Sequence, residues 1–573
     1  MRRAMPRKVL LYVLAVAALG VLLISTATAS AGVQAKSDGD TLIVLVPHLA
    51  PGLDGDGVGA NDPGLWQIYR NVYGHLVVYP TTKQGAVLVP NYNVRPSQFV
   101  PQLAESYSQK GLTWTFKLRK GIKSCAGNEL SADDVVYTIA RAKSVSGTTP
   151  LAWFLFNLMG VLPLDPLVSK DPKAKELKGE VTKIDNSTVQ VKQLNKTELF
   201  PRLFEIFGLN IYDSKEMKKH ATAKDPWSHS FATSQGAAGY GPYCITRWSK
   251  GSEIELAANP SWPQQPHFTK AIVRQVPVEA NRVAALRAGA ADIVTDLSPN
   301  SYDSLKSVSS VDVLSKFNNQ ATWMTMNYKF APWNLPKNKL LRQAVAYAMP
   351  YDEIIKSDYR GEAKRWYGMV PSAYYGYVPY KLYNTNIAKA KALLAQAGFP
   401  GGKGLDKYAS GLTLIYPAER AAVLEPVANR IRTALAAIGV PITLNPLSQT
   451  EVSDRENTKK DMPMSLIDYS APFGPDTGYG EQLYYVSVAK GGLNNGQNYS
   501  NATFDTLFAK GQLLTGAARK ASLAKTQRIL MEDLPIVPLA EFQSKIAVRK
   551  GLSGWLITTD NQPGLWSFTK AGK

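Results

Sequence analysis

Hydrophobic and polar residues alternate strictly at one place in the first quarter of the chain. Trp114, Phe116 and Leu118 are separated by threonine and lysine, and this period of two predicts a half-buried β-strand. Two glycines within the next ten residues predict a loop. Ser131, with Asp134 three positions later, is typical of a capped helix start. We therefore predict a strand, a loop and a helix in this order.

A helical period governs a later stretch of the chain. Apolar residues repeat every three or four positions in Asn384–Gly398 and in Leu424–Ile438, and a glycine ends each run. Short apolar runs at Leu412–Tyr416 and Ile442–Leu444 predict strands on either side of the second helix, which is a strand-helix-strand unit. Val181–Val191 surrounds an Asp-Asn pair and predicts a hairpin of a small additional subdomain. The pattern as a whole predicts an α/β protein.

The N-terminus has the features of a secretory signal peptide. Four basic residues precede the apolar run Val9–Ile24, and Ala27, Ala29 and Ala31 provide two Ala-x-Ala cleavage sequences. The run is shorter than the roughly 20 apolar residues of a membrane-spanning helix. We predict that residues 1–31 are a signal peptide and that the mature protein is extracytoplasmic; an uncleaved anchor is the alternative. No cysteine lies at the cleavage region to carry a lipid.

Export also bears on the two cysteines of the chain, Cys125 and Cys244. A single pair of cysteines in an exported protein favours an oxidised bridge. The alternative is two separate buried thiols. We predict the disulfide.

Length and charge narrow the class of protein further. A chain of 573 residues normally forms more than one hydrophobic core, because single cores stop growing at roughly 250–300 residues. The formal charge is +20, with four of the positive charges in the predicted leader. A basic surface is compatible with nucleic acid or with a solvated face near anionic lipid or cell wall. The absence of any nucleic-acid-binding motif, together with the export signal, favours the second interpretation and predicts no nucleic-acid partner.

No catalytic or metal-binding motif stands out. The sequence contains no His-Glu-x-x-His, Cys-x-x-Cys, Gly-x-Ser-x-Gly or phosphate-binding glycine loop. We therefore predict no metal, no cofactor and no enzymatic activity, although a triad assembled from distant residues stays open. The histidines are scattered along the chain, at His48, His75, His220, His229 and His267.

The block at 113–137 resembles the signature of the family 5 extracellular solute-binding proteins, the oligopeptide, dipeptide and nickel receptors of ABC importers. In that family Phe-x-Leu-Arg-x-Gly-Val is followed by a glycine and Ala-x-Asp-Val. Further matching blocks occur in the family's order along most of the chain after residue 65. They are Asn71–Tyr73, Pro101–Glu105, Gly241–Tyr243 with Asn259–Trp262, Ala285–Ile293, Arg342–Ala348, Ala388–Phe399, Tyr499–Leu507 and Pro535–Pro538.

The resemblance implies a two-lobe fold of the periplasmic-binding-protein type (type II), with a discontinuous first lobe and an extra small α/β subdomain. We predict lobe I with its subdomain at 36–272, lobe II at 273–534 and a C-terminal return to lobe I at 535–573. The chain would cross between the lobes near Val273–Pro277 and Pro535–Phe542.

The same resemblance implies a receptor, not an enzyme. The expected protein is a monomer that captures a peptide outside the membrane and delivers it to the permease of an ABC transporter. Two alternatives stay open. One is a receptor for an oligosaccharide or another amphiphilic small solute, and the other is a secreted hydrolase that reuses the fold.

Peptide receptors of this family hold the ligand's α-amino group with an aspartate in an Asp-Tyr element, and Asp468-Tyr469 resembles that element. A buried ammonium needs a carboxylate partner, because an unpaired buried charge is costly. The tryptophan that precedes the element in relatives is missing here, and Asp476 offers a competing alignment. Gly74 also replaces an acidic residue that some relatives place at the cleft.

Aromatic residues are crowded around position 370. Rings that combine apolar and polar character suit a cleft that closes over an amphipathic solute, although ordinary core packing is an alternative for many of them. We predict ligand contacts for Trp366, Tyr367 and Tyr375.

Overall fold

The computed structural model describes most of the chain after the predicted leader, and residues 1–31 lie outside the described residues. The described ranges are 39–56, 62–144, 151–161, 180–206, 209–236, 238–470 and 474–570. No helix within these ranges is long and apolar enough to cross a membrane.

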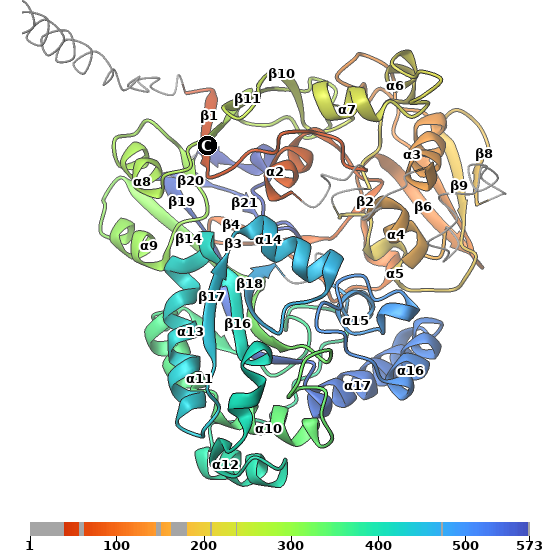
Figure 1. The fold of residues 1–573 in the computed structure, drawn as a ribbon. Helices are drawn as coiled ribbons and strands as arrows, with labels where there is room; N and C mark the ends of the chain where they lie inside the picture. The colour runs from red at the N-terminus through yellow and green to blue at the C-terminus, as the bar shows by residue number, and fades with distance from the viewer. Residues whose placement is uncertain are drawn as a thin grey trace, which may run out of the picture.

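One large mixed sheet of eleven strands runs through the molecule (Figure 1). Ten of its strands follow one another in a single path, and β15 (Ala363–Arg365) pairs with β19 off this path. In spatial order the ten are β10 (Tyr243–Ser249), β11 (Glu253–Ala258), β12 (Lys270–Gln275), β1 (Thr41–Val46), β13 (Ile293–Val294), β19 (Ile536–Arg549), β14 (Val311–Met326), β18 (Met464–Ser470), β16 (Thr413–Pro417) and β17 (Thr443–Leu447).

The two longest strands, β14 and β19, connect the two halves of this sheet. They pair antiparallel from Val311 to Phe317, and the register then breaks before Ala321 resumes pairing with Glu541. Before the break the sheet continues through β13 and β1, and after it through β18 and β16. We propose that the lobes meet at this break. Lobe I hereafter denotes the described residues before 318 and after 543, and lobe II denotes 321–541.

This pairing places the first crossing later than the sequence predicted. Val273 is the partner of Val44 in β1, and Gln275 is the partner of Val46. The chain then returns through β13, which also pairs with β1. Under this proposal residues 273–277 belong to lobe I, and the first crossing falls at 318–320.

Helices cover the sheet and fill the second lobe, and Figure 1 shows α13 along β16 and β17 and the α15–α17 group at the opposite side of lobe II. The described α-helices are α2 (Pro63–Val72), α3 (Ala132–Ser144), α4 (Leu151–Leu158), α5 (Leu199–Arg202), α6 (Ser214–Lys219), α7 (His229–Gln235), α8 (Glu279–Arg287), α9 (Pro299–Lys306), α10 (Asn338–Ala348), α11 (Tyr351–Glu353), α12 (Ile387–Gln396), α13 (Ala421–Ala436), α14 (Gln449–Asp454), α15 (Thr477–Tyr484), α16 (Ala502–Gln512) and α17 (Gly516–Asp533).

The predicted small subdomain is present as a four-stranded antiparallel sheet with α3 beside it. Its strands are β6 (Ala104–Lys110), β7 (Thr113–Leu118), β9 (Thr188–Lys192) and β8 (Val181–Lys183). The predicted strand is β7, with Trp114, Phe116 and Leu118 buried. The Ser131 amide donates to Asp134 Oδ2 at 2.8 Å at the start of α3. Three shorter sheets pair β2 (Val77–Val78) with β5 (Val100–Pro101), β3 (Thr81–Gln84) with β4 (Val87–Pro90) and β21 (Trp555–Leu556), and β20 (Leu552–Ser553) with β22 (Thr569–Lys570).

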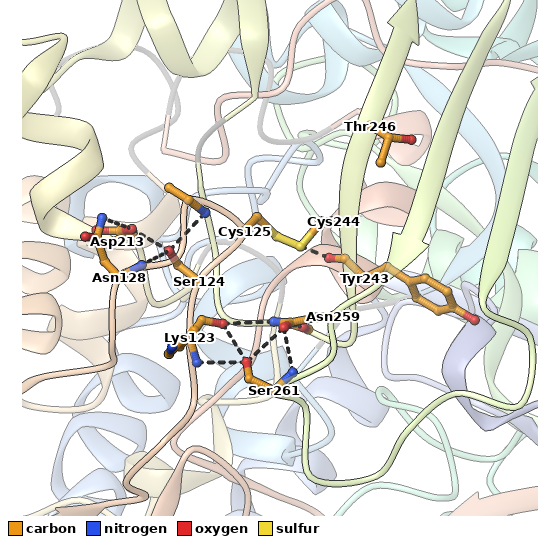
Figure 2. The surroundings of a disulfide bond; sticks show 12 residues. Lys123, Ser124, Cys125, Asn128, Asp213, Tyr243, Cys244, Thr246, Asn259 and Ser261 are labelled. Carbon is orange, nitrogen blue, oxygen red and sulfur yellow. Dashed lines mark hydrogen bonds between the residues drawn. A yellow bond between two sulfur atoms is a disulfide. The ribbon is translucent and has the colours of Figure 1, made fainter.

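A disulfide joins this subdomain to the large sheet, as the sequence predicts (Figure 2). It links Cys125, in the loop after β7, to Cys244 in β10, with 5.3 Å between their Cα atoms. Beside it, Asn259 Nδ2 donates to Lys123 O at 3.0 Å. Ser124 Oγ donates to Asp213 Oδ2 at 2.5 Å. The loop is thus fixed to the sheet by a covalent bond and by hydrogen bonds.

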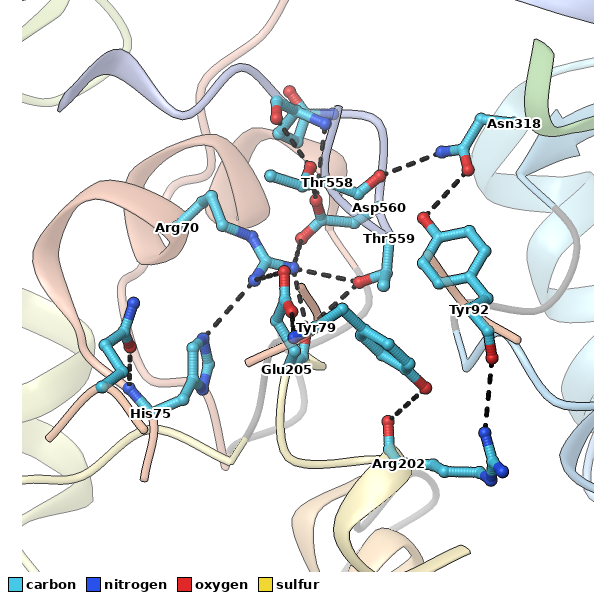
Figure 3. Close-up of polar contacts among 12 residues, drawn as sticks. Arg70, His75, Tyr79, Tyr92, Arg202, Glu205, Asn318, Thr558, Thr559 and Asp560 are labelled. Atoms are coloured by element: carbon cyan, nitrogen blue, oxygen red, sulfur yellow. Dashed lines mark hydrogen bonds and ion pairs between the residues drawn. The ribbon is translucent and has the colours of Figure 1, made fainter. Parts of the chain in front are cut away.

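The C-terminal segment is bound to the crossing between the lobes (Figure 3). Asn318, at the break in β14, donates from Nδ2 to Thr558 O at 3.0 Å and accepts from the Tyr92 hydroxyl at 2.9 Å. Arg70 of α2 donates to Asp560 Oδ2 at 3.0 Å. Because these groups are buried, the network holds α2, the crossing strand and the C-terminal loop in one arrangement.

The same network contains a histidine that stays neutral. His75 is buried, and Arg70 Nη1 lies 3.4 Å from its Nε2. Burial, and then the Arg70 charge, lower the pKa of His75 to about 3. Unfolding releases this imidazole to its ordinary pKa of about 6.5, so the stability it contributes is complete above that pH and is lost as the pH falls towards 3.

We expect the free energy of unfolding to fall by about 2 kcal/mol between pH 8 and pH 5 on account of His75. The His75→Gln variant should lose this part of the pH dependence, whatever its stability at pH 8. Urea unfolding at several pH values measures both chains. If the free energy of unfolding fell equally with pH in the two proteins, this would show that His75 does not take up a proton on unfolding.

Candidate functional site

The parallel strands of the two lobes point their carboxyl ends at the crossing region from opposite sides. β1, β12 and β13 are parallel to one another, and β16, β17 and β18 form a second parallel set. β13 and β14 are both antiparallel to β19, and β18 is antiparallel to β14, so the two sets run towards each other. Ligands of open α/β sheets bind outside the carboxyl ends of the strands. The candidate site therefore lies between these ends.

Asp468 lies near the carboxyl end of β18, in this region, and is paired with Arg420. The Arg420 Nη2 donates to Asp468 Oδ2 at 2.6 Å, and its Nε donates to Oδ1 at 3.2 Å. Arg420 follows the end of β16 in a short 3₁₀ segment, Ala418–Arg420. The two neighbouring parallel strands thus place an opposite-charge pair at their shared edge.

The two members of this pair differ in their access to solvent. The Asp468 side chain is 2% exposed and the Arg420 side chain 34%. Burial raises the pKa of Asp468 above its ordinary value, and Arg420 opposes the rise. Asp468 is the main cause that raises the pKa of Arg420, and Asp296, which follows β13 in lobe I, adds to it. Arg420 is therefore a cation that is stabilised by its ion pair with Asp468 and, over a longer range, by the charge of Asp296 in the other lobe.

Asp476, the competing alignment, has a different environment. It is fully buried and its Oδ1 accepts from the Gly478 amide at 2.8 Å, which caps α15. Arg519 Nη2 and Nη1 donate to its Oδ1 and Oδ2 at 2.6 and 3.0 Å. Burial is the largest single influence on the pKa of Asp476 and raises it, but Arg519, Arg202 and the Gly478 amide together bring this pKa below its ordinary value. The Asp476 carboxylate therefore already caps α15 and pairs with Arg519.

The predicted aromatic contacts do not gather into one surface. Trp366 is 1% exposed, and its Nε1 donates to Val370 O at 2.8 Å within lobe II. Tyr367 lies beside Arg365, whose Cζ is 5.0 Å from the ring centre. Tyr375 instead packs against Arg202 of lobe I. The backbone of Tyr469 belongs to β18, and its side chain lies outside the described residues.

The structure also explains the glycine that replaces an acidic residue of some relatives. A Cβ at Gly74 would lie 2.9 Å from Leu103 side-chain atoms and from Tyr240 O. A side chain at this position would have to displace packed backbone. Residue 74 therefore provides close packing between segments.

A cavity of about 270 Å³ lies between the lobes on the side of α17. Asn93 of lobe I and Tyr374, Tyr377 and Lys520 of lobe II contribute to its wall. The Lys520 Nζ lies 3.4 Å from Asn93 Oδ1, so the two lobes are in contact at this edge. No group of three His, Cys, Asp or Glu residues in the described ranges is arranged to hold a metal ion.

The sequence did not identify Arg420, Arg202 or Arg519. A charged residue just beyond a predicted parallel strand is a signal that points to Arg420. No comparable local signal exists for Arg519, whose partner Asp476 is distant in sequence. Arg202 has Glu198 four residues earlier, but its partner in lobe II, Asp476, is equally distant.

The family model of bacterial extracellular solute-binding proteins, family 5 (middle region), matches residues 98–491, well over half of the chain. The chain belongs to this family. Family 5 solute-binding proteins are receptors, so the prediction that the chain is not an enzyme is confirmed, as is the resemblance. At this level of detail the protein is the solute-binding component of an ABC importer.

Individual relatives of this family 5 protein bind different solutes. The heme-binding protein A of Haemophilus influenzae is 27% identical over 458 residues, which cover 77% of this chain and 78% of the relative. The dipeptide-binding protein of Escherichia coli is 25% identical, with 83% and 88% covered. The structure of the binding protein DppA from Helicobacter pylori in complex with the peptide STSA is 21% identical, covers 92% and 98%, and has a TM-score of 0.74. The predicted two-lobe α/β fold is thereby confirmed.

Proposed function

We propose that this family 5 receptor captures short peptides with free amino and carboxyl termini outside the cytoplasmic membrane and delivers them to an ABC permease. One observation carries the proposal, namely the Asp468–Arg420 pair at the carboxyl edge of the lobe II strands. Such a pair offers a partner to each charged end of a zwitterion. The basic, apolar and small-residue pattern of 1–31 supports an extracytoplasmic location.

The chemistry of the pair leaves room for both peptide termini. A carboxylate has about four lone-pair positions, and Arg420 occupies one on each oxygen of Asp468. An ammonium group can therefore still donate to Asp468. Arg420 uses Nε and Nη2 for Asp468, and its Nη1 makes no hydrogen bond within the described residues. A ligand carboxylate can accept from this nitrogen, in a charge-assisted bond.

Closure of the lobes gives the capture step a physical basis. The Asp468–Arg420 pair belongs to lobe II, and Asp296 of lobe I is near enough for its charge to raise the pKa of Arg420. A solute that contacts both lobes binds the closed form better than the open form and shifts the population towards it. A permease that recognises the closed form would then receive loaded receptors.

The relatives support a peptide as the ligand but do not exclude another solute. The E. coli relative is a dipeptide-binding protein and the H. pylori structure holds a tetrapeptide, STSA. The H. influenzae relative is a heme-binding protein. Heme is therefore the competing ligand that the experiment must include.

Calorimetry with four ligands tests the proposal: a mixture of dipeptides and tripeptides, its N-acetylated form, its C-amidated form, and heme. We expect the free peptides to bind. Each blocked form should lose most of its affinity, because the blocked terminus carries no charge to pair with Asp468 or Arg420. Binding of heme with no binding of peptides would overturn the proposal. Native mass spectrometry of the freshly purified protein gives an independent identification of the bound solute.

A further inference from the structure

Four buried charged residues meet where the segment around α5, in lobe I, touches lobe II. They are Glu198 and Arg202 from lobe I and Asp476 and Arg519 from lobe II, and Arg202, Asp476 and Arg519 have fully buried side chains. We propose that this cluster, with Tyr375, is a reversible latch that favours the closed arrangement of the lobes even without a ligand. The proposal does not depend on which solute is bound.

The lobe I half of the latch is a fixed arginine. Arg202 Nη2 donates to Val94 O at 2.6 Å, and Nη1 donates to Tyr92 O at 3.3 Å. Glu198, four residues earlier, places Oε2 3.7 Å from Arg202 Nη2. The guanidinium is thus positioned by its own lobe, with a carboxylate of that lobe close to it.

The lobe II half is a second ion pair, the Asp476–Arg519 pair described above, in which two nitrogens of the arginine meet two oxygens of the carboxylate. Its carboxylate belongs to the start of α15 and its arginine to the first turn of α17. This half is also complete without the other lobe.

Contacts between the halves form only when the lobes are together. Arg202 Nε lies 3.5 Å from Asp476 Oδ2, and its Cζ is 3.7 Å from the centre of the Tyr375 ring. Glu198 Oε1 accepts from the Gly516 amide at 2.6 Å, and its Oε2 lies 3.9 Å from Arg519 Nη1. The closed form therefore gains one hydrogen bond to a charged acceptor, one cation–π contact and two longer charge–charge approaches.

The arrangement of charges makes this contact reversible. Removing one partner from a buried ion pair is strongly destabilising, because an uncompensated charge remains. Here each lobe keeps one positive and one negative group when the lobes separate. Opening therefore leaves no charge without a partner of its own lobe. The cluster biases the population towards closure and still allows release.

The latch is separate from the proposed ligand-binding pair. Asp468 and Arg420 belong to β18 and to the segment after β16, whereas the latch uses the segment around α5 with α15 and α17. A failure of the peptide proposal leaves the latch proposal intact, since the test below uses no ligand.

Single-molecule fluorescence energy transfer on ligand-free full-length protein measures the closed fraction. Dyes are attached at Asp185→Cys, in the β8–β9 turn of lobe I, and at Lys391→Cys, in α12 of lobe II, while the native cysteines stay in their disulfide. Native mass spectrometry verifies that no solute is bound. Two test variants are made separately, Glu198→Gln and Tyr375→Leu. Their matched controls are Glu216→Gln and Tyr408→Leu. Glu216 is a lobe I carboxylate whose ion-pair partners within the described residues are Lys219 and His220, and Tyr408 is a lobe II tyrosine whose ring contacts Phe399 of the same lobe.

We expect the closed-to-open ratio to fall about 10-fold in each test variant. This is the size expected for losing one cation–π contact in Tyr375→Leu, or for replacing a charged acceptor of the Gly516 amide by a neutral one in Glu198→Gln. The controls should keep the wild-type ratio. Melting curves identify any variant that does not fold, and the other test variant then carries the experiment. An unchanged ratio in the folded test variants, or an equal fall in the controls, would overturn the latch.

Discussion

Replacement of Asp468 by alanine is expected to weaken the binding of a short peptide with free termini by about 2–5 kcal/mol. This is the usual effect of truncating one partner of a desolvated charge pair. In the variant, the ligand ammonium loses its carboxylate and Arg420 loses the acceptor for two hydrogen bonds. Calorimetry with the free peptide mixture measures the difference.

The chemical form of the peptide shows which residue holds which end. Acetylation of the peptide should weaken its binding to the wild-type protein and should have little further effect on Asp468→Ala. Amidation of the peptide should likewise weaken its binding to the wild-type protein and should have little further effect on its binding to Arg420→Gln. If acetylation weakens binding to Asp468→Ala as much as to the wild type, the amino group is held elsewhere.

The chain offers a closely matched control pair. Arg430 Nε donates to Asp358 Oδ2 at 2.8 Å and Nη2 donates to Oδ1 at 2.9 Å. The side-chain exposures are 33% and 4%, almost the same as for Arg420 and Asp468. Arg430 lies in α13, away from the carboxyl edge of the strands. Asp358→Ala should therefore perturb lobe II to a similar degree without weakening peptide binding.

Removal of the disulfide is expected to lower the free energy of unfolding by about 5 kcal/mol. The bridge closes a loop across a sequence separation of 119, and the chain-entropy model gives this magnitude for such a loop. Cys125 is exposed and Cys244 half-buried, so the Cys125→Ser, Cys244→Ser double variant leaves no large cavity. The expected loss therefore comes mainly from the greater freedom of the unfolded chain.

Guanidinium unfolding of the oxidised protein, the reduced protein and the double variant measures this loss. Reduction of the wild-type protein should reproduce the stability of the double variant, because both lack the same cross-link. A double variant as stable as the oxidised protein would show that the bridge contributes nothing, and thiol labelling before unfolding verifies its state.

Local patterns in the sequence predicted the elements that are stabilised locally. The alternation around Trp114 and the Ser131–Asp134 cap correspond to β7 and the start of α3. The apolar periods before Gly398 and Gly439 correspond to α12 and α13. In each case residues within one turn or one strand decide the conformation, so no distant partner was needed.

The crossing between the lobes could not be predicted in this way. β14 is a single strand of 16 residues, and its change of partners at 318–320 depends on β18 and β19, which lie more than a hundred residues later. The family resemblance instead suggested a first crossing near Val273–Pro277, but Val273 and Gln275 pair with β1 in the same half of the sheet.

The candidate site was predicted in part. The Asp-Tyr element pointed to Asp468, which lies at the carboxyl edge of lobe II, and its role in binding stays a prediction. Asp476 was an equal competitor in the sequence, because only its contacts with Arg519 and the start of α15 show how its carboxylate is used. The cation beside Asp468, Arg420, is 48 residues away in sequence. Its place just beyond a predicted strand could point to the residue, but no local pattern could show its pairing with Asp468.

The position of β19 affects how the protein acquires its structure. This strand lies in the middle of the large sheet, between β13 and β14, although it comes from the last forty residues of the chain. The sheet cannot be completed until Ile536–Arg549 has been synthesised, and such long-range pairing is slow to form. For an exported chain this order keeps the large sheet incomplete, and so easier to thread through a translocation channel, until β19 is available to pair with β13 and β14.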